Sequence, residues 1–133
     1  VIKPVLDAGG IVVADRSVFT SMAYQGFGRN LGIDRVLKIN KEAVEGIWPD
    51  SVIWIDTDLE TALARTRDSS GDKFERMDKK FFEKVRRGYM EVVRRFPKLV
   101  KRVDGNGSVK VVEKRVWSLI AGKIRGRVLT RSI

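Results

Sequence analysis

An acid and a base stand side by side at the point where an apolar run of the chain stops. The run Ile11–Ala14 is followed directly by Asp15 and Arg16. Its β-branched residues, and the two glycines before it, predict a strand over residues 11–15 that is buried on both faces. Ligands of open α/β sheets collect outside the carboxyl ends of the strands. At such a position a carboxylate can hold a hydrated Mg²⁺ and a guanidinium can bind a phosphate.

A capped helix is predicted directly after this pair. Ser17 is the expected N-cap, and Thr20, Ser21 and Tyr24 lie in the first turns. Thr20 and Tyr24 are four residues apart, so they share one face of a helix. Hydroxyl groups and an aromatic ring on one face suit a ligand with a phosphate at one end and a flat base at the other.

The next segment, residues 25–32, is punctuated by three glycines. Its spacing matches neither G-x-G-x-x-G nor the Walker A pattern G-x-x-x-x-G-K-[S/T], so we reject a phosphate cradle here. We favour a loop in which glycine provides positive φ angles.

This string of residues resembles the thymidylate kinase family of bacterial and archaeal type. The resemblance rests on Asp15-Arg16 and on the run TSMAYQGFGR at residues 20–29, and later segments extend it over nearly the whole chain. It implies a thymidylate kinase-like domain over residues 1–124, with a P-loop kinase fold. It also implies transfer of a phosphoryl group from ATP to dTMP, giving dTDP.

The resemblance assigns roles to individual residues of the string. Asp15 would orient Mg²⁺ through water, and Arg16 would clamp the acceptor phosphate. Ser17 departs from the aromatic residue or histidine that is usual after Asp-Arg, which changes one wall of the acceptor site. The substrate-binding residues implied beyond these are Thr20 and Ser21 at the thymine edge, Tyr24 beside the base or sugar, and Gln25.

A polar segment over residues 65–78 is the second candidate for chemistry. By composition it is an ordinary connection between two helices with solvated charges. By resemblance it is the lid, in which Arg65, Arg67 and Lys73 would bind the ATP phosphates, and Arg67 would reach the transferring phosphoryl group. Lys73 replaces the arginine usual in this motif, and lysine lacks a planar fork. A further arginine of some relatives is also missing at residues 68–70.

The remaining pattern predicts an α/β domain with a parallel sheet flanked by helices. Asp58 is expected to cap a helix, and the aromatic stripe of the helix 79–96 is interpreted as core. By resemblance the turn 104–107 lies near the adenine. The other predicted elements are helices at 1–8, 33–45 and 109–124, and strands at 51–57 and 99–103, the last an edge strand.

The sequence contains no Walker A motif. By resemblance, a P-loop strand belongs between the two strands at 11–15 and 51–57. A gap there would leave backbone groups unpaired, at about 1–3 kcal/mol for each buried group. We therefore expect a fragment, a truncated product or half of a split enzyme that is inactive alone. Its partner would be a P-loop segment or chain, or a second copy in a homodimer.

Composition narrows the chemistry further. The chain has neither cysteine nor histidine, so thiolate and imidazole chemistry are excluded. Its net charge of +10 fits either a polyanion ligand or a solvated Lys/Arg-rich surface. We favour the second, because acids are interleaved with the bases. No membrane-spanning run or leader is visible, so the expected location is the cytoplasm.

Two alternatives to a dTMP kinase remain open. One is a kinase for another nucleoside monophosphate, such as dUMP. The other is a degenerate, non-catalytic domain that binds nucleic acid or a partner chain. Nucleic acid is the less favoured ligand, because no basic helix carries interleaved aromatic residues. The basic tail at residues 125–133 is predicted to be loose.

Overall fold

The computed structural model describes residues 1–67 and 79–129, and the side chains of residues 1–65 and 79–125. The chain divides into two compact units, which we describe separately. The helical unit consists of Val1–Pro49 and Glu83–Arg94, and the sheet unit consists of Asp50–Phe82 and Arg95–Ile133.

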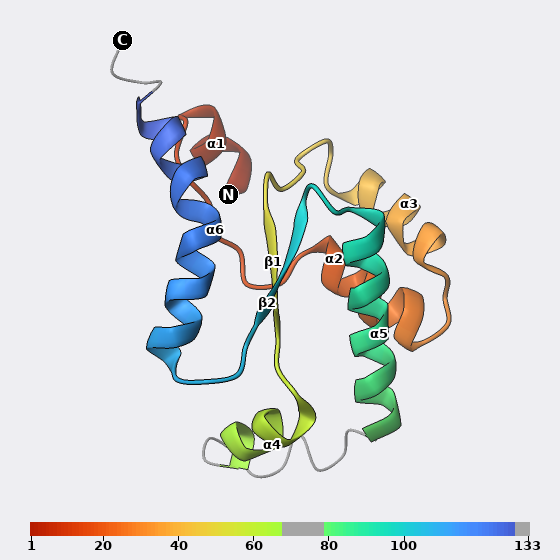
Figure 1. Cartoon of the computed structure of the whole chain (residues 1–133). Helices are drawn as coiled ribbons and strands as arrows, with labels where there is room; N and C mark the ends of the chain where they lie inside the picture. Colours follow the sequence, from red (N-terminus) through yellow and green to blue (C-terminus); the bar gives the residue numbers. More distant parts are fainter. Residues whose placement is uncertain (68–78, 130–133) are drawn as a thin grey trace. The chain divides into compact units, whose positions relative to one another are not determined.

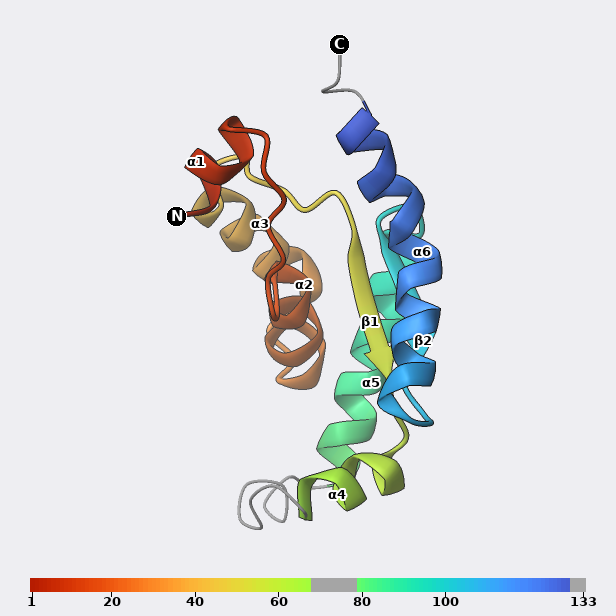
Figure 2. The same cartoon turned by 90° about the vertical axis from the view of Figure 1, so that its left-hand side faces the viewer.

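The helical unit is built from short helices that follow one another in the chain. Three of them, α2, η1 and α3, pack against one another, as Figures 1 and 2 show. Their buried side chains include Phe19, Met22 and Val36. The elements are α1 (Ile2–Asp7), α2 (Val18–Ser21), the π-helix η1 (Met22–Gly28), α3 (Ile33–Ala43) and the part of α5 (Lys79–Arg95) that belongs to this unit.

The start of α2 confirms Ser17 as an N-cap. The Ser17 hydroxyl oxygen accepts a hydrogen bond from the Phe19 N–H at 3.3 Å, and the Thr20 hydroxyl oxygen accepts one from the Ser17 N–H at 3.5 Å. This reciprocal pattern is a capping box, which satisfies donors that the first helical turn leaves free. It also fixes Thr20 at the beginning of the helix.

The predicted buried strand at residues 11–15 is wrong. These residues form neither helix nor strand, and Ile11 and Val13 are 48% and 92% exposed. A strand requires a neighbour that receives its backbone hydrogen bonds. Among the described residues, the ladder joins β1 to β2 only, so the apolar run has no such neighbour.

The predicted glycine loop is only partly a loop. Residues 22–28, including Gln25 and Gly26, continue the helix as η1, and the chain turns after it. Gly32 adopts a positive φ of 85° as expected, whereas Gly26 and Gly28 do not, and Asn30 adopts an unexpected positive φ of 59°. No residue pattern in this segment predicted the wider π-helical turn, which is rare in proteins.

The sheet unit contains a parallel pair of strands. β1 (Val52–Asp56) pairs with β2 (Val100–Asp104) in the register Val52↔Val100 to Asp56↔Asp104. β-branched and aromatic residues dominate β1, as expected for a buried strand. The helix α6 (Val109–Leu129) packs against β2, and α4 (Leu59–Arg67) follows β1. The prediction of an α/β fold with a parallel sheet flanked by helices is confirmed.

Two details of the helices can be compared with the sequence pattern. Asp58 caps α4 as predicted, because its carboxylate accepts hydrogen bonds from the Thr61 N–H at 2.8 Å and the Thr61 hydroxyl at 3.0 Å. The last helix continues to Leu129, into the segment that we predicted as a loose tail. Gly126 is of a type that often ends a helix, but here the helix continues through it.

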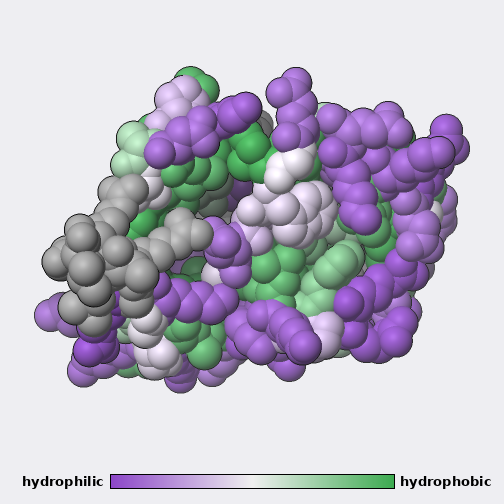
Figure 3. All heavy atoms as spheres, turned by 90° about the horizontal axis from the view of Figure 1, so that it is seen from above, coloured by the Kyte–Doolittle hydropathy of each residue, from purple (hydrophilic) through white to green (hydrophobic). Residues whose placement is uncertain are grey.

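Apolar side chains also reach the surface of each unit. On the face drawn in Figure 3, green hydrophobic atoms lie between purple hydrophilic side chains. Ile55 of β1 and Trp117 of α6 are each about half exposed. Within the part of the chain that the structure describes, no helix has the length and apolar character needed to cross a membrane.

Candidate functional site

Asp15 and Arg16 lie on an exposed turn that leads into α2. Arg16 has a φ of 68°, in the left-handed region that bulky side chains rarely adopt. Such a conformation costs about 1–3 kcal/mol and is concentrated at functional sites. Asn30 and Glu45 share this left-handed backbone, so the role of Arg16 stays a prediction.

Tyr89 of α5 connects two of the predicted substrate-binding residues. Its hydroxyl donates a hydrogen bond to the Thr20 hydroxyl oxygen at 3.3 Å. Its ring meets the Tyr24 ring edge-on, with 6.3 Å between centroids and 88° between planes. The prediction that Thr20 and Tyr24 share a helix face is consistent with this arrangement, because both contact the same side chain.

Gly88 allows α5 to approach η1 closely. A Cβ atom at residue 88 would lie 2.8 Å from the Ala23 carbonyl oxygen and 2.9 Å from the Phe27 Cβ. Both distances are shorter than real carbon contacts, so only glycine fits without movement. Close packing therefore accounts for this glycine within a helix, and the close approach brings Tyr89 within reach of Thr20.

The environment of Tyr89 keeps its hydroxyl protonated. Burial raises the pKa of Tyr89 above its ordinary value, and the nearby Tyr24 acts in the same direction. The hydrogen bond with Thr20 and the charge of Arg16 lower this pKa, but burial is the largest effect.

The other predicted residues of this region lie beside that cluster. Ser21 is half-buried, whereas Asp15 and Gln25 are exposed. The residues that follow Ser21, Met22 and Ala23, are fully buried and anchor the helix. The structure therefore brings Thr20 and Tyr24 together at Tyr89, and it leaves the roles of Asp15, Arg16, Ser21 and Gln25 as predictions.

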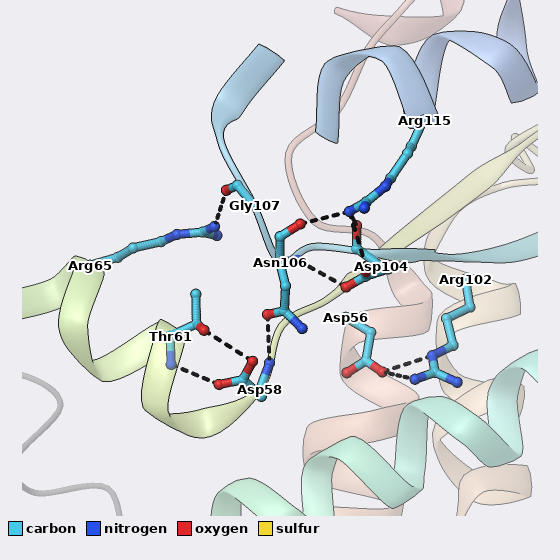
Figure 4. Close-up of polar contacts among 9 residues, drawn as sticks. All are labelled: Asp56, Asp58, Thr61, Arg65, Arg102, Asp104, Asn106, Gly107 and Arg115. Carbon is cyan, nitrogen blue, oxygen red and sulfur yellow. Dashed lines mark hydrogen bonds and ion pairs between the residues drawn. The ribbon is translucent and has the colours of Figure 1, made fainter. Parts of the chain in front are cut away.

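In the sheet unit, two aspartates face each other in register at the carboxyl ends of the strands. The buried Asp56 carboxylate is bound by two guanidinium nitrogens of Arg102, at 2.6 and 2.7 Å, as Figure 4 shows. Arg102 also lies 5.7 Å from the centre of the Trp54 ring. Asp104 is paired with Arg115 at 3.2 Å. Each carboxylate is thus balanced by an arginine, which offsets the repulsion between neighbouring anions.

The turn after β2 is held by contacts from three directions (Figure 4). The Asn106 side-chain oxygen accepts a hydrogen bond from the Asp58 N–H at 3.3 Å. Arg115 donates to the Asn106 carbonyl oxygen at 2.6 Å, and Arg65 donates to the Gly107 carbonyl oxygen at 2.7 Å. These bonds tie the turn to α4 and to α6.

The predicted lid residues are only partly within the described structure. Arg65 bonds to the turn after β2, so its guanidinium has a structural contact besides any role in the lid. Arg67 is the last residue of α4, and its side chain lies outside the described residues. Lys73 lies outside them as well.

The donor atoms near Asp15 suit a weakly held cation. Among residues 1–67 and 79–129, no three acidic, histidine or cysteine side chains cluster to form a metal site. Mg²⁺ commonly keeps several waters and takes one or two carboxylates together with substrate phosphates. A single exposed carboxylate at Asp15 fits such an ion, held mainly by the substrates.

Comparisons with known proteins agree with this geometry. The family model for thymidylate kinase matches residues 1–116. The chain belongs to the thymidylate kinase family. It is 41% identical over 125 residues to the thymidylate kinase of Anoxybacillus flavithermus, covering 92% of this chain and 60% of that protein. It is 37% identical over 122 residues to that of Limosilactobacillus fermentum, covering 90% and 57%.

A solved structure shows the same fold. The crystal structure of thymidylate kinase from Ehrlichia chaffeensis matches with a TM-score of 0.67 at 23% identity, covering 91% of this chain and 55% of that one. The chain thus spans about 60% of the length of the thymidylate kinases it matches.

Sequence reasoning missed Tyr89 as part of the site. Its spacing with Val85 and Val92 places it on the apolar stripe of α5, so we interpreted it as core. The available signal was the neighbouring Gly88. A glycine inside a long helix lowers helix stability, and it indicates that another element packs closely there. Tyr89 follows this glycine and carries a hydroxyl group at the end of its side chain. It was therefore a candidate for a polar contact with the helix that packs against Gly88.

Proposed function

We propose that this chain carries the acceptor-nucleotide site of a thymidylate kinase. The reaction is transfer of the γ-phosphoryl group of ATP to dTMP, giving dTDP. Family membership supports this reaction, and the cluster of Thr20 and Tyr24 around Tyr89 supports the location of the site. That cluster is the observation on which the proposal depends.

In this proposal the residues of the helical unit bind and orient the acceptor. Arg16 holds the dTMP phosphate with its planar guanidinium, which suits bidentate contacts. The Thr20 hydroxyl and Ser21 meet the edge of the base, and the Tyr24 ring lies against base or sugar. Orientation of the acceptor supplies a large share of catalysis in phosphoryl transfer, where the protein does little covalent chemistry.

The donor side of the reaction needs groups beyond these. Asp15 would hold Mg²⁺ through water, and the bound ion would supply neutralisation of the phosphate charge. Arg65, Arg67 and Lys73 are proposed to bind the ATP phosphates. The given sequence has no Walker A motif, and we propose that a P-loop segment or chain outside it completes the site. The exposed Ile11 and Val13 support this, because a neighbouring strand would cover them.

Two assays on the chain test the proposal. Thermal-shift titrations with dTMP, dUMP and dGMP should show the largest stabilisation with dTMP. A coupled ADP-release assay with ATP and dTMP should show little or no turnover by the chain alone. A larger shift with another nucleotide would assign a different acceptor. If no nucleotide has an effect and DNA binds with a steep salt dependence, the alternative of a nucleic-acid-binding domain is correct.

A further inference from the structure

The turn after β2 contains the only asparagine–glycine pair in the sequence. Asn106 is followed by Gly107, whereas Asn30 and Asn40 are followed by leucine and lysine. In an asparagine–glycine pair, the glycine nitrogen can attack the side-chain amide carbon of the asparagine, because glycine has no side chain that hinders the approach. Asparagine is one of the thermolabile residues of proteins for such reasons. The hydrogen bonds around the pair decide whether it reacts.

The atoms that would react in this pair are not held by other groups. The Gly107 N–H and the Asn106 Nδ2 group donate no hydrogen bond within the part of the chain that the structure describes. The acidic pair directly before it differs. There the Gly105 N–H donates to the Asp56 carbonyl oxygen at 2.8 Å, so this nitrogen is bound to β1 and cannot attack Asp104. The nucleophile and the leaving group are therefore available at residues 106 and 107 alone in this turn.

Two hydrogen-bond donors polarise the reacting groups, as Figure 4 shows. The Asp58 N–H donates to Asn106 Oδ1 at 3.3 Å, and this oxygen gains negative charge when the side-chain carbon is attacked. The Arg115 guanidinium donates to the Asn106 carbonyl oxygen at 2.6 Å. That carbonyl belongs to the same peptide group as the Gly107 nitrogen, so the positive charge favours loss of the Gly107 amide proton.

We propose that Asn106 is a site of spontaneous deamidation, in which the turn reacts with itself and then with water. The Gly107 nitrogen gives its proton to hydroxide and forms a bond to Asn106 Cγ. The Nδ2 group takes a proton from water and leaves as ammonia, so that a succinimide ring remains. A water molecule then opens the ring at either carbonyl, giving aspartate or iso-aspartate. The sum is uptake of water and loss of ammonia, without oxidation or reduction.

Either product changes the contacts that hold this turn. The new carboxylate lies near that of Asp104, which accepts a hydrogen bond from the backbone N–H of residue 106 at 3.0 Å, and like charges repel. Iso-aspartate also adds a carbon atom to the backbone. This shift weakens the hydrogen bond from Arg115 and the one from Arg65 to the Gly107 carbonyl oxygen. The modified chain should therefore melt at a lower temperature than the fresh chain.

Incubation of the purified chain at mildly alkaline pH, followed by tryptic digestion and mass spectrometry, tests the proposal. The peptide 103–110 should gain the mass of an amide-to-acid conversion. Electron-transfer fragmentation should place iso-aspartate at residue 106 and none at Asp104. The conversion should be at least about 10-fold faster at Asn106 than at Asn30 or Asn40, because a larger following residue hinders the attack. Equal rates at the three asparagines, or no conversion at Asn106, would overturn the proposal.

Three variants test the part played by the structure. Arg115→Met should slow the conversion about 3- to 10-fold, the size of one hydrogen bond from a charged donor. Arg65→Met is the matched control, because Arg65 bonds to the next carbonyl, that of Gly107, and should not slow it. Asn106→Gln has too long a side chain to close the same ring, so ageing should leave its mass and melting temperature unchanged. Faster conversion in Arg115→Met, or equal slowing in Arg65→Met, would contradict activation by Arg115 and overturn the proposal.

Discussion

The backbone of Gly88 in α5 lies against the backbone of Ala23 in η1, so closely that a side chain at residue 88 has no room. A Cβ there would come within 2.8 Å of the Ala23 carbonyl oxygen. The contact joins segments that are far apart in the sequence. It sets the distance at which Tyr89 meets Thr20 and Tyr24, and hence the geometry of the proposed acceptor site.

Replacing Gly88 by alanine should therefore destabilise the protein. Alanine favours helix by about 1 kcal/mol over glycine, but overpacking costs about 1–3 kcal/mol. We expect a net loss of free energy of unfolding, together with weaker dTMP binding, measured by urea denaturation and calorimetry. Gly122→Ala in α6 is the matched control, because nothing lies within 4 Å of a Cβ there. It should stabilise by about 0.5–1 kcal/mol, and equal effects at the two sites would contradict the packing argument.

Relief of backbone strain at Arg16 should separate stability from function. Arg16→Gly removes the cost of the left-handed φ of 68° but also the guanidinium. We expect stability equal to or above the wild type and at least about 10-fold weaker dTMP binding, as befits a lost charged contact. Glu45→Gly is the control, because Glu45 is exposed and has a φ of 49°. It should leave dTMP binding unaltered. Wild-type affinity in Arg16→Gly would remove Arg16 from the site.

The ion pair between Asp56 and Arg102 should contribute more than a surface pair. Asp56 is 3% exposed, so removing the guanidinium leaves a buried carboxylate with fewer partners. Arg102→Met should destabilise by about 1–3 kcal/mol, moderated because Arg102 itself is half exposed. Arg94→Met, which breaks the exposed pair with Glu91, should be indistinguishable from wild type in the same chemical denaturation series. A larger loss of stability in Arg94→Met than in Arg102→Met would show that other groups hold Asp56.

Removal of the cap at Asp58 should lower the melting temperature in a pH-dependent way. Hydrogen bonds from Thr61, first its N–H and then its hydroxyl, hold the pKa of Asp58 below its ordinary value. The stabilisation is therefore present above that ordinary value and is lost as the pH falls through the lower, folded-state pKa. Asp58→Ala should melt a few degrees lower than wild type at neutral pH, with the difference shrinking in acid. Asp58→Asn, which still caps, should show a smaller loss.

The sequence predicted structural features that depend on neighbouring residues. It did not predict features that depend on contacts between distant parts of the chain. Asp58 was identifiable as a cap because capping involves the side chain of one residue and backbone N–H groups of the helical turn that follows it. The run Ile11–Ala14 was interpreted as a strand because apolar, β-branched residues favour one, yet a strand forms only beside a partner. Tyr89 was assigned to the core because the apolar periodicity of its helix predicts which side chains are buried. Periodicity does not predict which group the Tyr89 hydroxyl contacts.

The most direct test of the account is a nuclear magnetic resonance titration of the ¹⁵N-labelled chain with dTMP, with dGMP as control. The account predicts that dTMP causes the largest amide shifts at residues 15–25 and around Tyr89, at concentrations where dGMP causes almost none. Shifts confined to the sheet unit, or equal effects of the two nucleotides, would contradict the claim that α2 and η1 carry the acceptor site.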